Sequence, residues 1–193
     1  MLFCYILCSF EYEVIKKIIQ RINSELDREV PFVFEHLVGM DSRVKEMLDL
    51  CLGERLNCVR LVGICGMGGI GKTTLAREVY NRIFRDFEAR NFVANVREES
   101  KRRRLVSLQK YILSTILMGT GKNILDVEEG KKFLSKRLCN KKVLIVLDDV
   151  NDDEQLKALA RKDWFGPGSI IIVTSRDRHL LNTYWDGVID IYS

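Results

Sequence analysis

The sequence predicts an α/β fold of three layers, in which helices cover both faces of a mostly parallel five-stranded sheet. Two observations support this fold class. Short apolar runs alternate with longer stretches of helical periodicity along most of the 193 residues. The run Val143–Leu147 is also apolar on both faces, as is typical of a parallel strand buried between layers of helices. A chain of this length buries about 70% of its unfolded surface, so we expect one domain with an appendage.

Residues 1–33 are expected to lie outside this domain. The apolar stretch 1–10 is about half the length of a membrane span, and it lacks the basic start and cleavage site of a signal peptide. Residues Glu11–Leu26 place apolar side chains at helical spacing opposite a charged face, which predicts an amphipathic helix. A linker containing Pro31 follows, and the domain itself is expected to cover residues 34–193.

The expected elements of the domain alternate along the chain. A helix is expected at Val44–Leu52, with Asp41 or Ser42 as its N-cap. The strands are expected at 58–64, 91–96, 143–147, 169–174 and 187–192. Further helices are expected at 72–84, 106–117, 127–138 and 154–160. Trp164 is expected to be buried in the core.

A glycine-rich loop joins the first strand to the helix that follows it. The loop has the G-x-x-x-x-G-K-[ST] spacing of a P-loop. Glycines let backbone N–H groups turn toward a phosphate, and the helix adds its positive N-terminal dipole. Lys72 is expected to reach the β- and γ-phosphates, and the Thr73 hydroxyl to ligate Mg²⁺. The motif therefore predicts a P-loop that binds the phosphates of a nucleotide. Its binding residues are Gly66, Gly68, Gly69, Gly71, Lys72, Thr73 and Thr74.

Charged residues follow two of the later strands. Asp148 and Asp149 come after the apolar run on strand 143–147, and Arg176 comes after strand 169–174. Open α/β sheets bind ligands at the carboxyl ends of their strands. Asp148 is expected to hold the Mg²⁺ that Thr73 also contacts, while Asp149 either activates a water or caps the next segment. Arg176 suits a γ-phosphate because its guanidinium forms paired hydrogen bonds, although it could instead pair with Asp177 or a neighbouring acid.

The composition argues against several other classes of protein. The net charge of +4 and the pI of about 8.7 are too small for a dedicated nucleic-acid binder. Part of this charge lies in Lys101–Arg104, which we interpret as a solvated loop, with an anion-binding or localisation patch as the alternative. The six cysteines form no C-x-x-C pair, which argues against zinc and suits a reducing compartment. The expected location is the cytoplasm, or both cytoplasm and nucleus.

Four segments in order resemble the NB-ARC domain of plant disease-resistance proteins, a family of STAND-type switch ATPases. These segments are 66–76, 92–98, 142–150 and 166–177. Ala94–Glu98 and Asn151 look like the subclass that carries an N-terminal TIR domain. The resemblance implies an ADP-bound resting state, an ATP-bound active state and slow hydrolysis, hence at most a weak ATPase. It also implies that Val38 and Gly39 lie near the adenine and that Arg176 senses the γ-phosphate.

The sequence departs from that family in what it lacks. No TIR domain, leucine-rich repeat, or helical and winged-helix subdomain is recognisable in it. We therefore expect the nucleotide-binding core of a truncated receptor, which binds nucleotide weakly because one side of the ligand stays in water. Two alternatives stay open. One is an interaction fragment or decayed gene product that pairs with other receptor chains or does nothing. The other is a P-loop phosphotransferase with a small-molecule acceptor.

Overall fold

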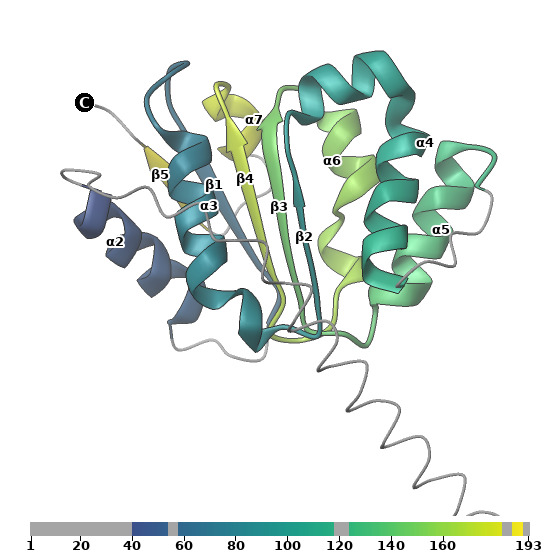
Figure 1. Cartoon of the computed structure of the whole chain (residues 1–193), viewed down its shortest axis with the longest axis horizontal. Helices are drawn as coiled ribbons and strands as arrows, with labels where there is room; N and C mark the ends of the chain where they lie inside the picture. Colours follow the sequence, from purple (N-terminus) through teal and green to yellow (C-terminus); the bar gives the residue numbers. More distant parts are fainter. Residues whose placement is uncertain (1–39, 54–57, 118–123, 183–186, 191–193) are drawn as a thin grey trace, which may run out of the picture. The chain divides into compact units, whose positions relative to one another are not determined.

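The computed structural model describes residues 40–53, 58–117, 124–182 and 187–190, all within the second of two compact units, Leu37–Ser193. Its strands are β1 (Arg60–Cys65), β2 (Ala89–Val93), β3 (Val143–Val150), β4 (Ile170–Ser175) and β5 (Gly187–Asp190). They form one sheet in the order β2-β3-β4-β1-β5, and every neighbouring pair is parallel (Figure 1). The predicted five-stranded parallel sheet is confirmed. The predicted helix at 11–26 lies outside the described residues.

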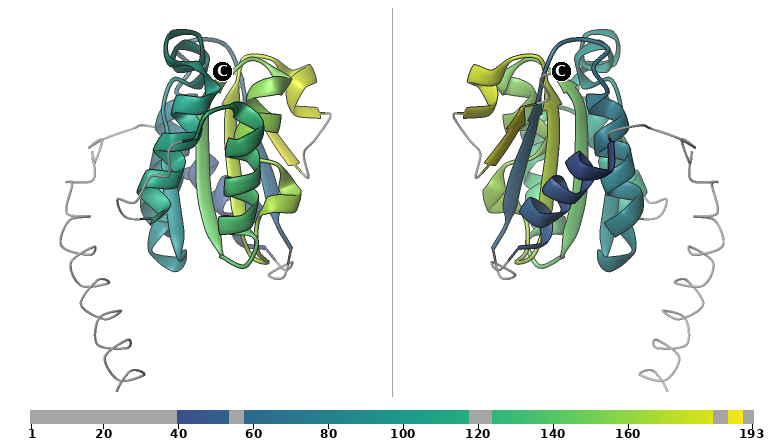
Figure 2. Two further views of the ribbon diagram at one scale, coloured as in Figure 1. Left: turned by 90° about the vertical axis from the view of Figure 1, so that its right-hand side faces the viewer. Right: turned by 90° about the vertical axis from the view of Figure 1, so that its left-hand side faces the viewer.

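Helices cover both faces of this sheet, as Figures 1 and 2 show. One face carries α2 (Met40–Leu52) and α3 (Lys72–Ile83). The other carries α4 (Val96–Leu117), α5 (Val127–Leu138) and α6 (Asp153–Leu159). The short helix α7 (Arg178–Asn182) precedes β5, and 3₁₀ turns lie at Phe84–Asp86 and Lys162–Trp164. The three predicted layers are therefore present.

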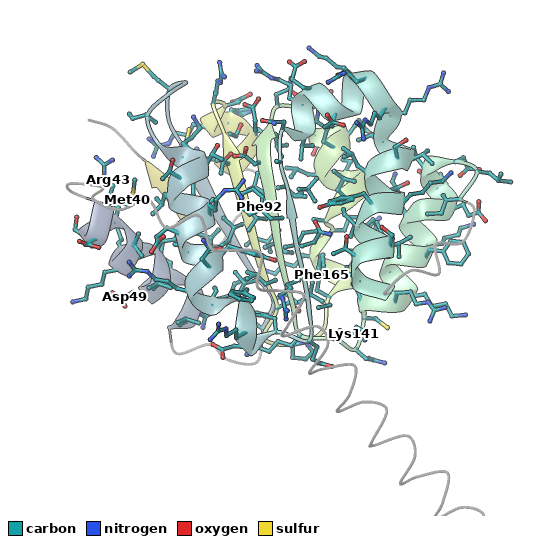
Figure 3. The ribbon with its side chains drawn as sticks, viewed as in Figure 1. Met40, Arg43, Asp49, Phe92, Lys141 and Phe165 are labelled. Atoms are coloured by element: carbon teal, nitrogen blue, oxygen red, sulfur yellow. The ribbon has the colours of Figure 1, made fainter. Side chains whose placement is uncertain are left out.

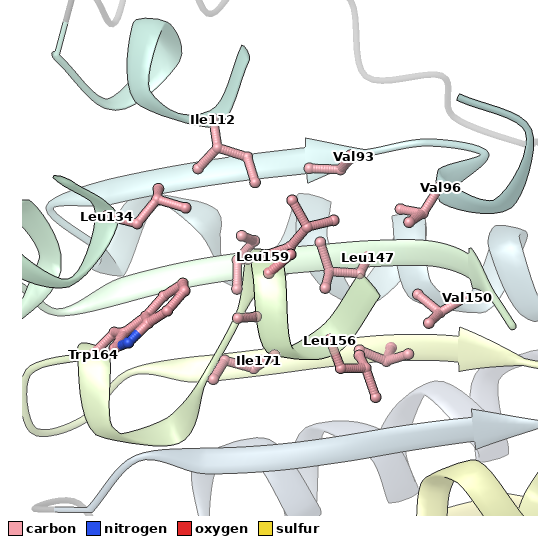
Figure 4. Packing of buried hydrophobic residues seen from close by; sticks show 14 of the residues in the cluster. Val93, Val96, Ile112, Leu134, Leu147, Val150, Leu156, Leu159, Trp164 and Ile171 are labelled. Atoms are coloured by element: carbon pink, nitrogen blue, oxygen red, sulfur yellow. The ribbon is translucent and has the colours of Figure 1, made fainter. Parts of the chain in front are cut away.

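The buried strands supply both halves of the core because their side chains alternate between the faces. In β3, Leu144 and Val146 pack with α2 and α3, whereas Val143, Ile145 and Leu147 pack with α4, α5 and α6. Phe92 and Phe165 mark these two sides in Figure 3. Figure 4 shows the second side, where Trp164 (4% exposed) packs among aliphatic side chains as predicted.

A buried glutamine ties three helices of this second side together. The Nε2 of Gln109 in α4 donates to the carbonyl oxygens of Val127 (3.0 Å) and Ala158 (2.9 Å), at the start of α5 and near the end of α6. Gly130 in α5 makes room for this amide. A Cβ added at Gly130 would lie 2.0 Å from Gln109 Oε1.

The end of α2 is held by an arginine of the neighbouring strand. Nη1 of Arg60 in β1 donates to the carbonyl oxygens of Cys51 (2.6 Å) and Leu50 (3.2 Å), and Nη2 donates to that of Gly53. The last carbonyls of a helix have no intrahelical partner, so the guanidinium supplies one for Leu50 and Cys51 at the end of α2 and for Gly53 just after it. Cys51 is itself buried.

Several sequence-based expectations about the elements were wrong. The strand expected at 91–96 begins at Ala89 and ends at Val93, and the helix expected at 106–117 begins at Val96. Residues Lys101–Arg103 are helical and lie within α4 rather than in a loop, whereas Arg104 (φ 65°, ψ 155°) is not helical and forms the kink that joins the two parts of α4. Their side chains are exposed, but the pair Glu99–Arg103 (3.1 Å) supports the helix across one turn. Helix α2 begins at Met40, so Asp41 and Ser42 lie in its first turn and are not its N-cap. An acidic side chain there still favours the helix dipole.

Candidate functional site

A cavity of about 290 Å³ opens where the carboxyl ends of the strands meet the N-terminus of α3. Four adjacent strands or the segments that follow them contribute to its wall. Its lining residues are Gly68, Gly69, Gly71, Lys72, Thr73, Thr74, Asn95, Asp148, Asp149, Thr174 and Arg176. The cavity therefore lies at the edge of the sheet where α/β proteins bind ligands.

The glycine loop of this cavity needs glycine for two physical reasons. Gly69 (φ 80°) and Gly71 (φ 94°) adopt the left-handed conformation, in which a side chain is strained. Gly71 is also the residue from which α3 starts. Gly68 instead lies against a guanidinium, since a Cβ there would be 3.3 Å from Cζ and Nη1 of Arg176. The loop thus presents bare backbone to the cavity and to Arg176.

Lys72 is almost completely buried beneath this loop. Its side chain is 7% exposed, and its Nζ donates to the carbonyl oxygens of Gly66 (2.8 Å) and Met67 (2.7 Å). An ammonium has three N–H donors, so one remains for a further acceptor. Burial and then the nearby Arg176 lower the pKa of Lys72 below its usual 10.5, while Asp149 partly offsets them. Lys72 therefore lies where an added anion would stabilise its charged form.

Asp148 lines the same cavity as Lys72 and is 2% exposed. Its Oδ1 accepts hydrogen bonds from the hydroxyl groups of Thr73 and Thr174, each at 2.7 Å. A buried carboxylate next to a hydroxyl oxygen offers the hard oxygen ligands that Mg²⁺ prefers, and Mg²⁺ usually takes only one or two carboxylates from the protein. The donor set of Thr73 and Asp148 fits this ion.

Strand β3 contains an irregularity at these acids. Leu147 pairs with Val173 and Val150 with Ser175, so β3 has one more residue than β4 between the two pairs. Asp149 lies in this bulge with φ 54°, and its N–H donates to Thr174 Oγ1 (2.9 Å). Bulges of this kind re-aim side chains near functional sites. Asp148 and Asp149 consequently both line the cavity, although they are consecutive in a strand.

Two guanidinium groups share the Asp149 carboxylate. The Nε of Arg97 lies 3.0 Å from Oδ2, and the Nε of Arg176 lies 3.7 Å from Oδ1. Asp149 does not cap the next segment, because the N-cap of α6 is Asp152. The acid within ion-pair distance of Arg176 is Asp149 rather than Asp177, whose carboxylate accepts from the backbone N–H groups of α7.

The structure brings together most of the residues that the sequence predicted for the site. Gly66 does not line the cavity but accepts a hydrogen bond from Lys72. Val38 and Gly39 lie outside the described residues. Asp148 and Asp149 lie within β3, which ends at Val150, rather than after the strand.

Three residues of the site were missed. Asn95, Arg97 and Thr174 had no assigned role, although Asn95 and Thr174 line the cavity and Arg97 holds Asp149. The last residues of every parallel strand could have indicated Thr174 and Asn95. The pairing of Arg97 depends on β2 lying beside β3, which no local pattern shows.

A glycine loop between β1 and α3, a buried lysine at its end and an aspartate on a neighbouring strand together define the fold class of the P-loop NTPases. The family model of the NB-ARC domain matches residues 39–187. The chain belongs to the NB-ARC family, as the resemblance implied.

Relatives and a solved structure agree with this family and fold. The chain is similar to the disease resistance protein RUN1 of Vitis rotundifolia, with 44% identity over 76% of this chain and 11% of RUN1. It is similar to the TMV resistance protein N of Nicotiana glutinosa, with 38% identity over 88% of this chain and 15% of that protein. It therefore spans only a small part of the length of these relatives. A crystal structure of Cdc6p from Pyrobaculum aerophilum shares the fold alone, with a TM-score of 0.61 and 18% identity over 82% of this chain and 46% of Cdc6p.

The helices give one further result on membranes. Among the helices that the structure describes, none combines the length and the apolar character needed to cross a bilayer.

Proposed function

We propose that the chain is an ADP/ATP-binding switch module of a plant immune receptor-like protein, with a Mg²⁺-bound nucleotide at the glycine loop and slow or no hydrolysis. In this proposal residues 34–193 form the nucleotide-binding subdomain. The single observation that supports it best is the convergence of Lys72, Thr73, Asp148 and Arg176 on one cavity from three adjacent strands. The family to which the chain belongs supports the immune context.

Each polar group of the cavity has a chemical role in this proposal. The backbone N–H groups at the start of α3 and the free donor of Lys72 bind phosphate oxygens. Thr73 and Asp148 hold Mg²⁺, which neutralises phosphate charge when it is bound. Arg176 binds the γ-phosphate, and Asp149 is the candidate for orienting a water. The slow or absent hydrolysis in this proposal follows from the family to which the chain belongs.

The test is calorimetric titration of the full chain with ADP and with ATP in the presence of Mg²⁺. Lys72→Ala removes a charge-assisted hydrogen bond worth about 1.5–3 kcal/mol, so both affinities should fall about 10- to 100-fold. Lys132→Ala is the matched control, since that lysine is exposed on α5. It should bind as the wild type does. Asp148→Asn should weaken binding with Mg²⁺ and change it little in EDTA.

The outcome that contradicts the proposal is equally direct. If the folded wild-type chain binds neither nucleotide at millimolar concentration, the proposed function is wrong. If Lys72→Ala and Lys132→Ala bind equally well, nucleotide binds elsewhere.

A further inference from the structure

The junction between β2 and α4 contributes to the wall of the cavity. Strand β2 ends at Val93, and the chain then turns through Asn95, which has φ 52° and lines the cavity wall. Non-glycine residues with positive φ are uncommon and are often found at functional sites. Three are found among the described residues: Asn95 and Asp149 line the cavity, and Arg104 does not. This turn starts α4 at Val96 and thereby carries Arg97 to the Asp149 carboxylate.

Arg97 is the stronger of the two cationic partners of Asp149. Its Nε lies 3.0 Å from the carboxylate, compared with 3.7 Å for Arg176. Its side chain is also less exposed, 29% against 55%, so solvent screens its charge less. Glu98 is a more distant acid, at 3.9 Å from the same nitrogen. In the described part of the chain the Arg97 Nε–H has no aligned acceptor, so the contact with Asp149 is an ion pair.

Arg176 is placed between Asp149 and the glycine loop. Its guanidinium packs on Gly68, while its Nε is within ion-pair distance of Asp149. A guanidinium in this position has two alternative acceptors, the carboxylate on one side and a phosphate over the loop on the other. Which of the two acceptors Arg176 binds depends on how far the negative charge of Asp149 is already neutralised.

We propose that Arg97 is a positioning residue for triphosphate recognition, which neutralises Asp149 and so leaves Arg176 available to the γ-phosphate. This inference rests on the proposed function. Without Arg97, Arg176 becomes the main partner of Asp149 and is withdrawn from the ligand. The negative charge of Asp149 is then also less compensated and repels the γ-phosphate. Both effects act on ATP and spare ADP, which has no γ-phosphate.

The experiment compares ADP with a non-hydrolysable ATP analogue, each with Mg²⁺, by calorimetry. The variants are Arg97→Gln, Asp149→Asn and the double variant. Contacting charges couple strongly, so Arg97→Gln should weaken the analogue about tenfold and ADP less than about twofold. The double variant should return to the analogue affinity of Asp149→Asn alone, because an uncharged residue 149 no longer captures Arg176.

The outcomes distinguish a failure of the role inferred for Arg97 from a failure of the proposed function. Equal weakening of ADP and the analogue by Arg97→Gln, or a double variant as weak as Arg97→Gln, overturns the positioning role. A wild-type chain that binds neither ligand overturns the proposed function as well. If Arg97→Gln does not fold by circular dichroism, Arg97→Lys takes its place. Its retained charge should give a smaller loss that is again confined to the analogue, and an equal loss for both ligands would overturn the inference.

Discussion

Replacing Thr174 by valine tests how the two acids are held. Thr174 is 1% exposed, and its hydroxyl donates to Asp148 Oδ1 (2.7 Å) while accepting from the Asp149 N–H (2.9 Å). Valine has the same shape but makes neither bond. The bond to the carboxylate is worth about 1.5–3 kcal/mol, and the orphaned N–H costs about 1–3 kcal/mol if water does not reach it. The extra buried methyl group returns about 0.8 kcal/mol.

Thr174→Val should therefore destabilise the fold by about 2–4 kcal/mol. For a chain of this size that lowers the Tm by about 5–15 °C. Urea unfolding followed by circular dichroism measures the free energy of unfolding, and an unchanged m-value would show that the unfolded state is the same. Thr174→Ser is the control, since it keeps the hydroxyl and should cost only about 1 kcal/mol for the lost methyl group. Equal losses in the two variants, or a loss below about 0.5 kcal/mol for valine, would refute the reasoning.

Two further predictions concern the core. Gly130→Ala drives a methyl group into the Gln109 amide, and such overpacking should lower the free energy of unfolding by about 1–3 kcal/mol in urea. Adding Gln109→Ala should make the double variant less destabilised than the sum of the two single changes, and strict additivity would contradict the clash. Burial raises the pKa of the Cys51 thiol from 9.0 to about 12, against the opposing effect of Arg60. The unfolded thiol therefore ionises first, and stability should fall above pH 9 by up to about 1.4 kcal/mol per pH unit. Cys51→Ala should show a correspondingly smaller loss between pH 8 and pH 10, and an identical pH dependence would refute this origin.

Local patterns were sufficient for most of the fold. A run such as Val143–Leu147 is apolar on both faces only if helices cover both sides of its sheet, and the structure has this arrangement. The prediction of a loop at Lys101–Arg104 was wrong because a run of charged residues is typical of loops. Whether such a run is helical depends on ion pairs one turn apart and on the packing of α4 on β2 and β3. The packing is not visible in the local sequence.

The residues of the candidate site likewise fall into those that the local sequence predicts and those that depend on tertiary contacts. Lys72 and Thr73 belong to a loop of contiguous residues, so their spacing alone predicted them. Thr174 and Arg97 act through contacts with residues 25 or more positions away in the chain, and those contacts depend on the order of the strands. The bulge at Asp149 is likewise visible only when β3 is laid against β4.

That bulge limits which amino acids the chain can carry at position 149 before any chemistry is considered. With φ at 54°, glycine, asparagine and aspartate are among the residues that adopt this conformation most readily, and β-branched residues fit worst. Replacing Asp149 by alanine would therefore combine a backbone penalty with the loss of the carboxylate. Asparagine changes the charge and keeps the conformation. Natural variants at this position should therefore favour these residues whether or not they bind nucleotide.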